Sequence, residues 1–231
     1  FTQMRRKINL MKAIILAAGK GKRFGDITKK TPKPLIKLGK LSLIEHNIML
    51  LKKYGYNDIV INVSHLRDLI IDYLGDGSKY DIKIEYSIED PEPYETGGGI
   101  KYALNLLGDK PFLVINSDIY TDFNLSNFEL NKNDLASLVM VRNPNHNAKG
   151  DFSIFKGRVI VKEKNELTYS GISILNPKIF ENFNDRKFKL IDVFLEQIKK
   201  DNVTGQIHNG TWIDIGTTDR LKIAEELFVN N

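Results

Sequence analysis

A glycine-rich, basic loop follows a short apolar run near the start of the chain. The apolar run occupies residues 13–18 (AIILAA), and the loop occupies residues 19–23 (GKGKR). Eight basic residues and a single acid, Asp26, lie between Lys20 and Lys40. Glycine lets the backbone turn tightly and approach an anion, while clustered cations balance several phosphate charges. The loop therefore predicts a site for a polyphosphate such as a nucleoside triphosphate.

The spacing of this loop differs from two common phosphate-binding motifs. A P-loop requires serine or threonine after Gly-Lys, but Arg23 follows Gly21 and Lys22. A dinucleotide fingerprint requires a third glycine at the position of Phe24. A simple turn that carries solvated charges is a competing interpretation of the loop taken alone.

Two aspartates could hold a metal ion. Asp118 comes two residues after the apolar run 112–116, and Asp214 comes two residues after the only tryptophan, Trp212. Ligands of an open parallel sheet bind at the carboxyl ends of its strands, so Asp118 is expected in that crevice. Mg²⁺ prefers oxygen ligands and usually shares its coordination shell with substrate phosphates. A capping or turn role is as well supported for Asp118 by the residues alone, and better supported for Asp214.

Apolar β-branched runs alternate with helical patterns over the first part of the chain. This alternation predicts right-handed βαβ units and a mainly parallel sheet. The expected strands are residues 13–18, 58–63, 82–86, 112–116 and 136–141, and the expected helices are residues 43–54, 66–74 and 99–107.

The second half of the chain is less regular. Two antiparallel strands are expected at residues 152–161 and 167–175, with Gly157 at a hairpin turn. A helix at 190–199, a strand at 206–213 and a helix at 219–228 complete the pattern. The predicted fold is one α/β domain over residues 11–231, with a Rossmann-like, mostly parallel sheet flanked by helices. A small antiparallel, substrate-facing lobe is expected at about residues 143–213.

Composition narrows the class of protein further. The 231 residues include no cysteine, which excludes disulfides and a thiol nucleophile and is compatible with a reducing cytoplasm. No apolar stretch approaches the roughly 20 residues of a membrane span, so no membrane partner is expected. The net charge of +5 is concentrated beside the glycine loop without interleaved aromatic residues, so nucleic acid is not expected as a partner. Residues 1–10 are interpreted as an upstream extension or a cloning remnant rather than a secretory signal.

Several segments together resemble a known family. Residues 19–23 followed by residues 32–34 (PKP) resemble the signature of the sugar-1-phosphate nucleotidyltransferases. Residues 95–99 (ETGGG), 116–118 (NSD) and 212–217 (WIDIGT) match the same family in the same order. Within this family the chain is most similar to the subgroup that transfers uridylyl groups to N-acetylmuramate 1-phosphate. The segments that support the subgroup are residues 74–78 (LGDGS), 150–152 (GDF), 170–173 (SGIS) and 188–190 (FKL).

The resemblance implies a reaction and a set of site residues. A sugar-1-phosphate oxygen would attack the α-phosphorus of a nucleoside triphosphate, with Mg²⁺ as cofactor and pyrophosphate as the leaving group. Arg23, Lys33 and Asp118 would be catalytic, and Asp118 and Asp214 would bind the metal. The implied nucleotide-binding residues are Ala17, Ala18, Gly19, Gly21, Lys22, Arg23, Lys33, Glu89, Thr96 and Gly97. The implied sugar-binding residues are Asn116, Asp151, Gly171 and Lys189.

The choice of base and sugar remains open from the sequence. Glu89 stands where the family often has glutamine, and a carboxylate can only accept hydrogen bonds, from uracil N3–H or from guanine N1–H and its amino group. UTP and N-acetylmuramate 1-phosphate are expected, with Lys189 as a candidate for binding the lactyl carboxylate of muramate. Neither Lys162 nor Lys164 aligns with the family lysine that binds the sugar phosphate.

The same residues are compatible with two other functions. Guanylyl or thymidylyl transfer to mannose-, heptose- or glucose-1-phosphate is one alternative to the expected substrate pair. A non-catalytic module that binds a nucleotide-sugar is another, although a binding module would not require both metal carboxylates. A cytoplasmic monomer or simple homodimer, acting in cell-wall precursor recycling, is expected.

Overall fold

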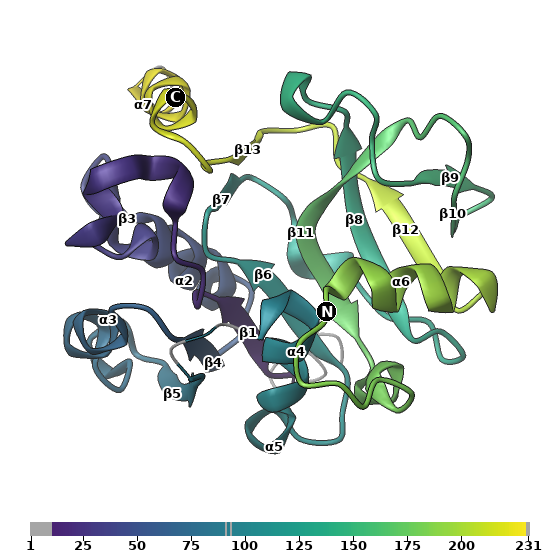
Figure 1. Ribbon diagram of the computed structural model, residues 1–231, viewed down its shortest axis with the longest axis horizontal. Coiled ribbons are helices and arrows are strands. Elements are labelled where there is room, and N and C mark those ends of the chain that lie inside the picture. Colours follow the sequence, from purple (N-terminus) through teal and green to yellow (C-terminus); the bar gives the residue numbers. More distant parts are fainter. Residues whose placement is uncertain (1–10, 91, 93, 230–231) are drawn as a thin grey trace.

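A nine-stranded sheet runs through the centre of the protein (Figure 1). The computed structural model describes residues 11–90, 92 and 94–229, so the predicted N-terminal extension, residues 1–10, lies outside the described residues. In spatial order the strands of the described part are β5 (Lys83–Ile88), β4 (Asp58–Val63), β1 (Ala13–Leu16), β6 (Phe112–Asn116), β11 (Leu167–Leu175), β8 (Ala136–Arg142), β12 (Val203–Ile207), β10 (Arg158–Ile160) and β9 (Ser153–Phe155).

Most strands of this sheet run in one direction. β5, β4, β1 and β6 are mutually parallel, and β12 is parallel to β8. β11 is antiparallel to both β6 and β8, and β10 is antiparallel to both β12 and β9. Within the described sheet, therefore, β11 and β10 oppose the other seven strands. The predicted mostly parallel α/β fold is confirmed, and the strands of the region 143–213 that join this sheet extend it.

Helices cover both faces of the sheet. Because side chains alternate along a strand, Ala13 and Ile15 of β1 face one apolar cluster and Ile14 faces another. The first cluster includes residues of α2 and α3, and the second includes residues of α4, α5 and α6. The helices are α2 (Leu43–Lys53), α3 (Arg67–Leu74), α4 (Glu95–Tyr102), α5 (Leu104–Leu107), α6 (Leu190–Lys199) and α7 (Thr218–Val229).

A third apolar cluster joins the N-terminal loop to the C-terminal segment. Phe24, Leu38 and Leu43 pack there with Ile215 and Ala224, the last of which lies on α7. Figure 1 shows α7 beside the segment that leaves β13 (Trp212–Asp214). The cluster therefore holds the loop after β1 against residues that lie almost two hundred positions later in the chain. No helix in the described part of the chain combines the length and apolar character needed to cross a membrane.

α2 begins with a hydrogen-bonded cap. The Glu45 carboxylate accepts hydrogen bonds from the Ser42 N–H and hydroxyl, both at 2.7 Å, and from the Tyr73 and Tyr80 hydroxyls, both at 2.9 Å. Burial alone would raise the pKa of Glu45, but these donors outweigh it and lower the pKa to about 2. A buried, ionised carboxylate thus fixes the start of the helix that packs beneath β1.

Several expected elements differ in detail. The strand expected at 206–213 is two strands, β12 and β13, because the chain turns between them. β13 pairs antiparallel with β7 (Ile119–Thr121), a pairing that two three-residue strands do not reveal by alternation. The strand expected at 152–161 is a hairpin of β9 and β10, turned at Lys156 and Gly157, both at positive φ. The helix expected at 99–107 begins earlier, at the start of α4, and divides at Ala103 into α4 and α5.

Candidate active site

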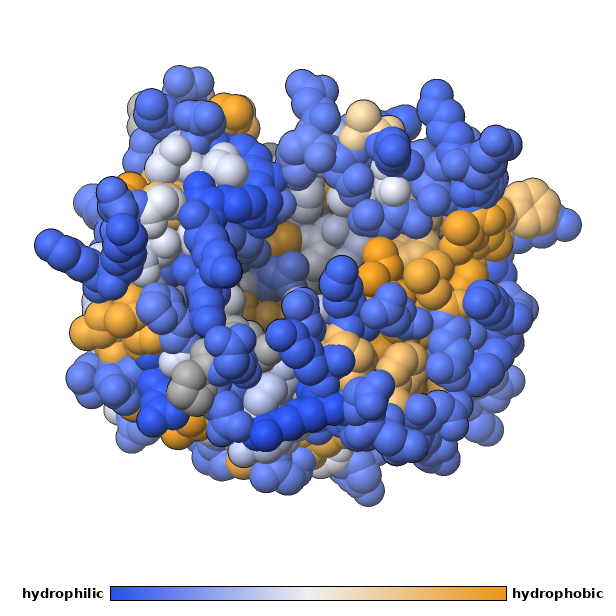
Figure 2. All heavy atoms as spheres, viewed as in Figure 1, coloured by the Kyte–Doolittle hydropathy of each residue, from blue (hydrophilic) through white to orange (hydrophobic). Residues whose placement is uncertain are grey.

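A cleft of about 450 Å³ opens at the carboxyl ends of β1 and β6. Figure 2 shows the hollow in the centre of the face that Figure 1 presents, surrounded largely by hydrophilic residues. Nine of the ten predicted nucleotide-binding residues line the cleft: Ala17, Ala18, Gly19, Gly21, Lys22, Arg23, Lys33, Glu89 and Thr96. The tenth, Gly97, does not line it, and its N–H donates instead to the Phe188 carbonyl (3.0 Å). Asn62, Glu95 and Gly216 also line the cleft. The sequence assigned no binding role to them, although Glu95 and Gly216 lie in two of the segments that match the family.

The loop after β1 folds back on the segment that carries Lys33. Gly21 has a φ of 62°, a conformation that glycine adopts without strain. A Cβ at this position would lie 2.9 Å from Thr28 Cγ2 and 3.0 Å from Lys33 Cβ. The Thr28 hydroxyl donates to the Gly21 carbonyl (3.1 Å) and closes the loop. Glycine at position 21 is therefore what lets Lys33 approach the loop so closely.

Two of the predicted catalytic residues meet directly. Lys33 Nζ forms an ion pair with Asp118 Oδ2, and both side chains are largely buried. Lys33 lies between Pro32 and Pro34, which restrict the backbone that carries it. Arg23, by contrast, makes no hydrogen bond or ion pair with any residue that the structure describes. Its guanidinium is thus available to an anion in the cleft.

A buried amide of α2 fixes the turn that carries Asp118. Asn47 Nδ2 donates to the carbonyls of Ser117 (3.3 Å), Ile119 (3.1 Å) and, within its own helix, Leu43 (3.1 Å). Asn47 is almost fully buried, so these carbonyls have no water to replace it. The turn between β6 and β7 is consequently held from below by one side chain that the sequence analysis did not identify.

The two predicted metal carboxylates lie on adjacent backbone segments: Asp118 directly precedes β7, and Asp214 is the last residue of β13. Asp214 of β13 pairs with Ile119 of β7, and the next residue, Ile215, donates its N–H to the Asp118 carbonyl (2.8 Å). Asp214 Oδ2 accepts a hydrogen bond from Arg220 Nη1 (2.9 Å). Its other oxygen, Oδ1, is buried and has no hydrogen-bond partner among the described residues.

This donor set fits a divalent cation. A buried carboxylate oxygen without a partner is costly unless something positive binds it. Within the described residues no group of three or more histidine, cysteine, aspartate or glutamate side chains is arranged around a metal position. Asp118 and Asp214 would therefore supply two oxygen ligands and leave the others to substrate phosphates and water, which is usual for Mg²⁺.

The ends of two arginine side chains and Asp214 lie close to the backbone at Gly216. A Cβ there would lie 3.0 Å from Arg23 Nη2 and from Asp214 Oδ1, and closer still to Arg220 Nη2. Arg220 also donates to His146 Nε2 (2.7 Å). Burial and the Arg220 guanidinium lower the pKa of His146, which favours the neutral imidazole that accepts this bond.

Glu89 is a buried acceptor at the inner end of the cleft. Its Oε1 accepts from Asn62 Nδ2 (2.6 Å), and its Oε2 accepts from the Tyr94 N–H (2.9 Å). Asn62 is oriented in turn by the Ala17 N–H, which donates to its Oδ1 (2.8 Å). Burial raises the pKa of Glu89, and these two donors only partly oppose that effect. Gly99 is required beside it, because a Cβ there would lie 2.5 Å from Glu89 Oε1.

A second cavity, of about 310 Å³, adjoins the first cleft. After the predicted residues that line them, the first is called the nucleotide cleft and the second the sugar cavity below. Asn116 lines both spaces, and Asp151 and Gly171 line the sugar cavity, as three of the four predicted sugar-binding residues. Gly171 has a φ of 83° at a bulge in β11, and a Cβ there would lie 2.7 Å from Asn116 Nδ2. Asp151 is fixed by Asn147 Nδ2 (3.0 Å) and the Tyr169 N–H (2.8 Å).

Lys189, the fourth predicted sugar-binding residue, does not line the sugar cavity or the cleft. It is exposed at the start of α6, where the N–H of the next residue, Leu190, donates to Thr96 Oγ1 (3.1 Å). Neither Lys162 nor Lys164 lines either space, and Lys162 pairs with Glu166 (3.3 Å).

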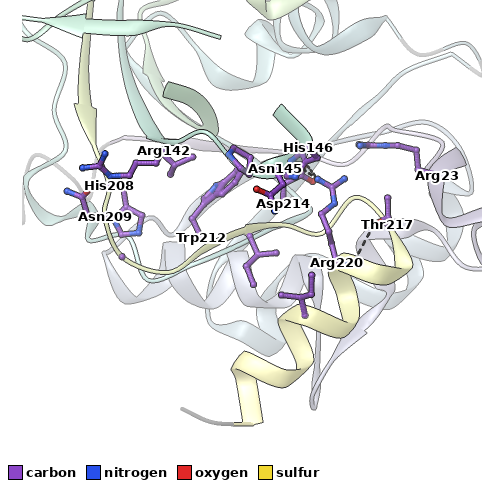
Figure 3. A pocket seen from close by; sticks show the side chains of 15 residues that line it. Arg23, Arg142, Asn145, His146, His208, Asn209, Trp212, Asp214, Thr217 and Arg220 are labelled. Carbon is purple, nitrogen blue, oxygen red and sulfur yellow. Dashed lines mark hydrogen bonds and ion pairs between the residues drawn. The ribbon is translucent and has the colours of Figure 1, made fainter. Parts of the chain in front are cut away.

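The largest of these spaces, about 810 Å³, lies between residues 141–146, residues 208–214 and α7, and is called the basic cavity below (Figure 3). It shares Arg23 with the nucleotide cleft, and it shares His146, Trp212 and Asp214 with the sugar cavity. No sequence motif indicated it. The three spaces are therefore neighbours, each sharing at least one lining residue with the other two.

Comparison with known proteins fits this arrangement. The model of the family described as nucleotidyl transferase matches residues 12–229. The chain belongs to the nucleotidyl transferase family. It is 42% identical to the N-acetylmuramate alpha-1-phosphate uridylyltransferase of Neisseria meningitidis serogroup B, over 94% of this chain and 98% of that protein.

Other proteins similar to this chain are more distant. The mannose-1-phosphate guanyltransferase of Aspergillus oryzae is 32% identical over 89% of this chain, which spans 61% of that relative's length. A crystal structure of a putative glucose-1-phosphate thymidylyltransferase from Bacillus anthracis, in complex with sucrose, superposes with a TM-score of 0.83 at 24% identity and covers 94% of each chain. This last likeness concerns the fold.

Proposed function

We propose that the protein transfers a uridylyl group from UTP to N-acetylmuramate 1-phosphate, giving UDP-N-acetylmuramate and pyrophosphate. The observation that carries the proposal is the junction at Asn116, where a cleft lined by Arg23, Lys33 and Asp118 meets a second cavity lined by Asp151 and Gly171. The 42% identity over nearly the whole of both chains supports the choice of uridylyl group and sugar.

The reaction needs charge compensation rather than a base. The attacking sugar-phosphate oxygen is already ionised at neutral pH, so it forms a bond to the α-phosphorus while the bond to the β-phosphate oxygen breaks and pyrophosphate leaves. The barrier lies in bringing two polyanions together and in stabilising the charge that develops on the phosphates. Arg23, which has no partner among the described residues, and Lys22 line the cleft where the leaving pyrophosphate would be held.

Asp118 and Asp214 would hold Mg²⁺, which when bound supplies positive charge to the phosphates and helps to orient them. In the structure Lys33 neutralises Asp118 and Arg220 neutralises Asp214. Lys33 would bind the α-phosphate or the incoming sugar phosphate in exchange for its bond to Asp118. The same pairs thus keep the aspartates neutralised before substrates bind.

Base selection would depend on Glu89. Each of its oxygens already accepts one hydrogen bond and can accept another, so the carboxylate favours a base that presents an N–H. Uracil N3–H meets this requirement. Guanine N1–H meets it too, and the likeness to a guanyltransferase favours GTP with mannose 1-phosphate as the second candidate.

A substrate panel tests the proposal. Each of UTP, GTP, TTP and ATP is combined with N-acetylmuramate, N-acetylglucosamine, mannose and glucose 1-phosphates, and pyrophosphate release is measured with Mg²⁺ or with EDTA. UTP with N-acetylmuramate 1-phosphate is expected to give the highest kcat/KM, and EDTA is expected to abolish it. Preference for GTP with mannose 1-phosphate would overturn the substrate pair, and nucleotide binding without pyrophosphate release would indicate a non-catalytic module. On this proposal the protein acts in the cytoplasm, in the recycling of cell-wall precursors.

A further inference from the structure

We propose that the basic cavity binds the carboxylate of an acidic substituent on the sugar, and that Arg142 supplies the cation. The proposal rests on the proposed function and names the residue that would distinguish a muramate from a glucosamine. The two sugars differ by one lactyl ether, which adds a carboxylate. A receptor for that carboxylate must adjoin the sugar cavity and must carry an unpaired positive charge.

The sugar cavity itself is a poor receptor for an anion. Its lining includes the carboxylates of Asp151 and Asp214, and none of its lining residues, all in the described part of the chain, is lysine or arginine. A carboxylate placed there would face the charge of Asp151 and would lose its hydration with no lysine or arginine on the lining to compensate. An acidic substituent must therefore leave this cavity through one of its openings.

The opening past His146 and Trp212 leads to the opposite electrostatic environment. These two residues and Asp214 line both the sugar cavity and the basic cavity, so the two spaces adjoin at these side chains. Three arginines, Arg23, Arg142 and Arg220, line the basic cavity, against one carboxylate among its described lining residues. An acidic group that crosses this opening passes from a negative to a positive environment.

Arg142 is the arginine that is both available and outside the proposed catalytic machinery. Arg220 is already bonded to Asp214 and His146, and Arg23 lines the nucleotide cleft. His208 is held by Asp122 (2.9 Å). Arg142 makes no hydrogen bond or ion pair with any residue that the structure describes. Figure 3 shows it on the wall of the cavity with His208, with Trp212 between it and Asp214.

The backbone holds Arg142 close to the sugar cavity. It is the last residue of β8 and pairs with Leu167 of β11, and the preceding pair is Val141 with Thr168. Thr168 lines the sugar cavity. Although successive pairs of a sheet point to opposite faces, Arg142 ends its strand and lines the basic cavity, one residue from the pair that reaches the sugar cavity. The length of its side chain allows the guanidinium to bind a carboxylate there through two parallel hydrogen bonds, which the ammonium of a lysine cannot do.

Lys189, the residue that the sequence indicated for this role, lies on a different wall. It is exposed at the start of α6, next to Thr96 of the nucleotide cleft, and it lines neither the basic cavity nor the sugar cavity. Substitutions can therefore test Lys189 and Arg142 separately, because the two residues lie on different walls.

Kinetics with a matched pair of sugars test the proposal. For each variant, kcat/KM is measured with saturating UTP for N-acetylmuramate 1-phosphate and for N-acetylglucosamine 1-phosphate, which lacks only the lactyl group. Arg142→Gln is expected to lower the preference for the muramate about tenfold, the size of effect typical of a hydrogen-bonded charge pair, and to leave the glucosamine rate within about twofold. Arg142→Lys is expected to restore part of the preference, and Lys189→Ala to leave it unchanged. An unchanged preference in Arg142→Gln, or its loss in Lys189→Ala, would overturn the proposal.

A binding measurement separates this proposal from the proposed function. Trp212 is the only tryptophan in the sequence and lines both cavities, so its fluorescence reports ligands there without turnover. N-acetylmuramate without phosphate is expected to change the fluorescence at about tenfold lower concentration than N-acetylglucosamine, and Arg142→Gln is expected to remove this difference. Equal titrations of the wild-type protein by the two sugars would overturn the cavity assignment even if uridylyl transfer is observed. A muramate preference in binding together with no pyrophosphate release would overturn the proposed function alone.

Discussion

Arg220 and Asp214 form an ion pair at the position where a divalent cation is proposed to bind. One oxygen of Asp214 accepts from Arg220 at 2.9 Å, and the other is buried without a partner among the described residues. The guanidinium therefore competes with the cation for the same carboxylate. It also extends to His146 on the wall of the sugar cavity, so its position depends on both sites.

Removing this competitor is expected to strengthen metal binding in the absence of nucleotide. Arg220→Gln should lower the Kd for Mn²⁺, measured by the electron paramagnetic resonance signal of the free ion, by about fivefold, since a partly buried pair contributes ~1 kcal/mol. Arg158→Gln is the matched control, because Arg158 also pairs with aspartates, Asp134 and Asp201, but lines none of the three spaces. Unchanged or weaker Mn²⁺ binding in Arg220→Gln would refute the competition.

Helix α2 positions Asp118 through Asn47 and is itself fixed by Glu45. Asn47→Ala removes the donor to the Ser117 and Ile119 carbonyls, and leaves them buried without a partner. We expect a loss of about 2–3 kcal/mol in unfolding free energy and a higher Mg²⁺ concentration for half-maximal activity, because the turn that carries Asp118 loosens. Met49→Ala, on the partly exposed face of the same helix, should leave the Mg²⁺ requirement unchanged. Equal Mg²⁺ requirements in the two variants would show that Asn47 has no positioning role.

Glu45 gives α2 a stability that depends on pH. Because its folded-state pKa is about 2 and its ordinary value is 4.5, folding favours the ionised form. The associated stability is fully present above about pH 4.5 and is lost as the pH falls toward 2. Glu45→Gln is therefore expected to lower the unfolding free energy by about 1–3 kcal/mol at pH 7, with the difference narrowing below pH 4.5. Urea denaturation at pH 7, 5, 4 and 3.5 measures it, and a difference independent of pH would contradict the assignment.

The sequence revealed the elements whose residues carry a local pattern. The apolar run before Gly19, the strand before Asp118 and the amphipathic helix at Leu190–Lys199 all appear where periodicity placed them. The positive φ of Gly21 follows from the need to turn after a strand. Residue types and the family resemblance together were enough to name nine residues that line the nucleotide cleft and three that line the sugar cavity.

Features that depend on long-range pairing could not be predicted in this way. Asp214 reaches Asp118 only because β13 pairs with β7, and strands of three residues leave no alternation to detect. In the sequence Asn47 looks like any polar residue of a helix, because its role depends on the turn between β6 and β7 that packs against it. Arg142 and Arg220 belong to no motif, and their importance comes from the cavity that residues distant in the sequence enclose.

The active site brings together the loop that follows β1 and the segment that precedes α7. Arg23 follows the first strand and lies beside Gly216, just before the last helix, and the cluster of Phe24, Ile215 and Ala224 fixes this contact. A ligand that bridges the cleft therefore stabilises the fold as one unit. UTP with Mg²⁺ at about 100 times its Kd should add about 2.7 kcal/mol, which for a domain of this size raises Tm by roughly 5–10 °C.

The cation requirement makes this prediction specific. With EDTA in place of Mg²⁺, the triphosphate lacks the charge of the cation and Lys33 and Arg220 stay paired with the two aspartates, so UTP at the same concentration is expected to raise Tm by less than half as much. Asp214→Asn is expected to abolish the difference between Mg²⁺ and EDTA, because it removes the carboxylate whose buried oxygen has no protein partner among the described residues. Differential scanning fluorimetry at fixed UTP measures all four conditions. A shift of equal size with Mg²⁺ and with EDTA in the wild-type protein would show that the aspartates hold no cation with the nucleotide, and that Arg23 and the lysines of the loop bind the triphosphate alone.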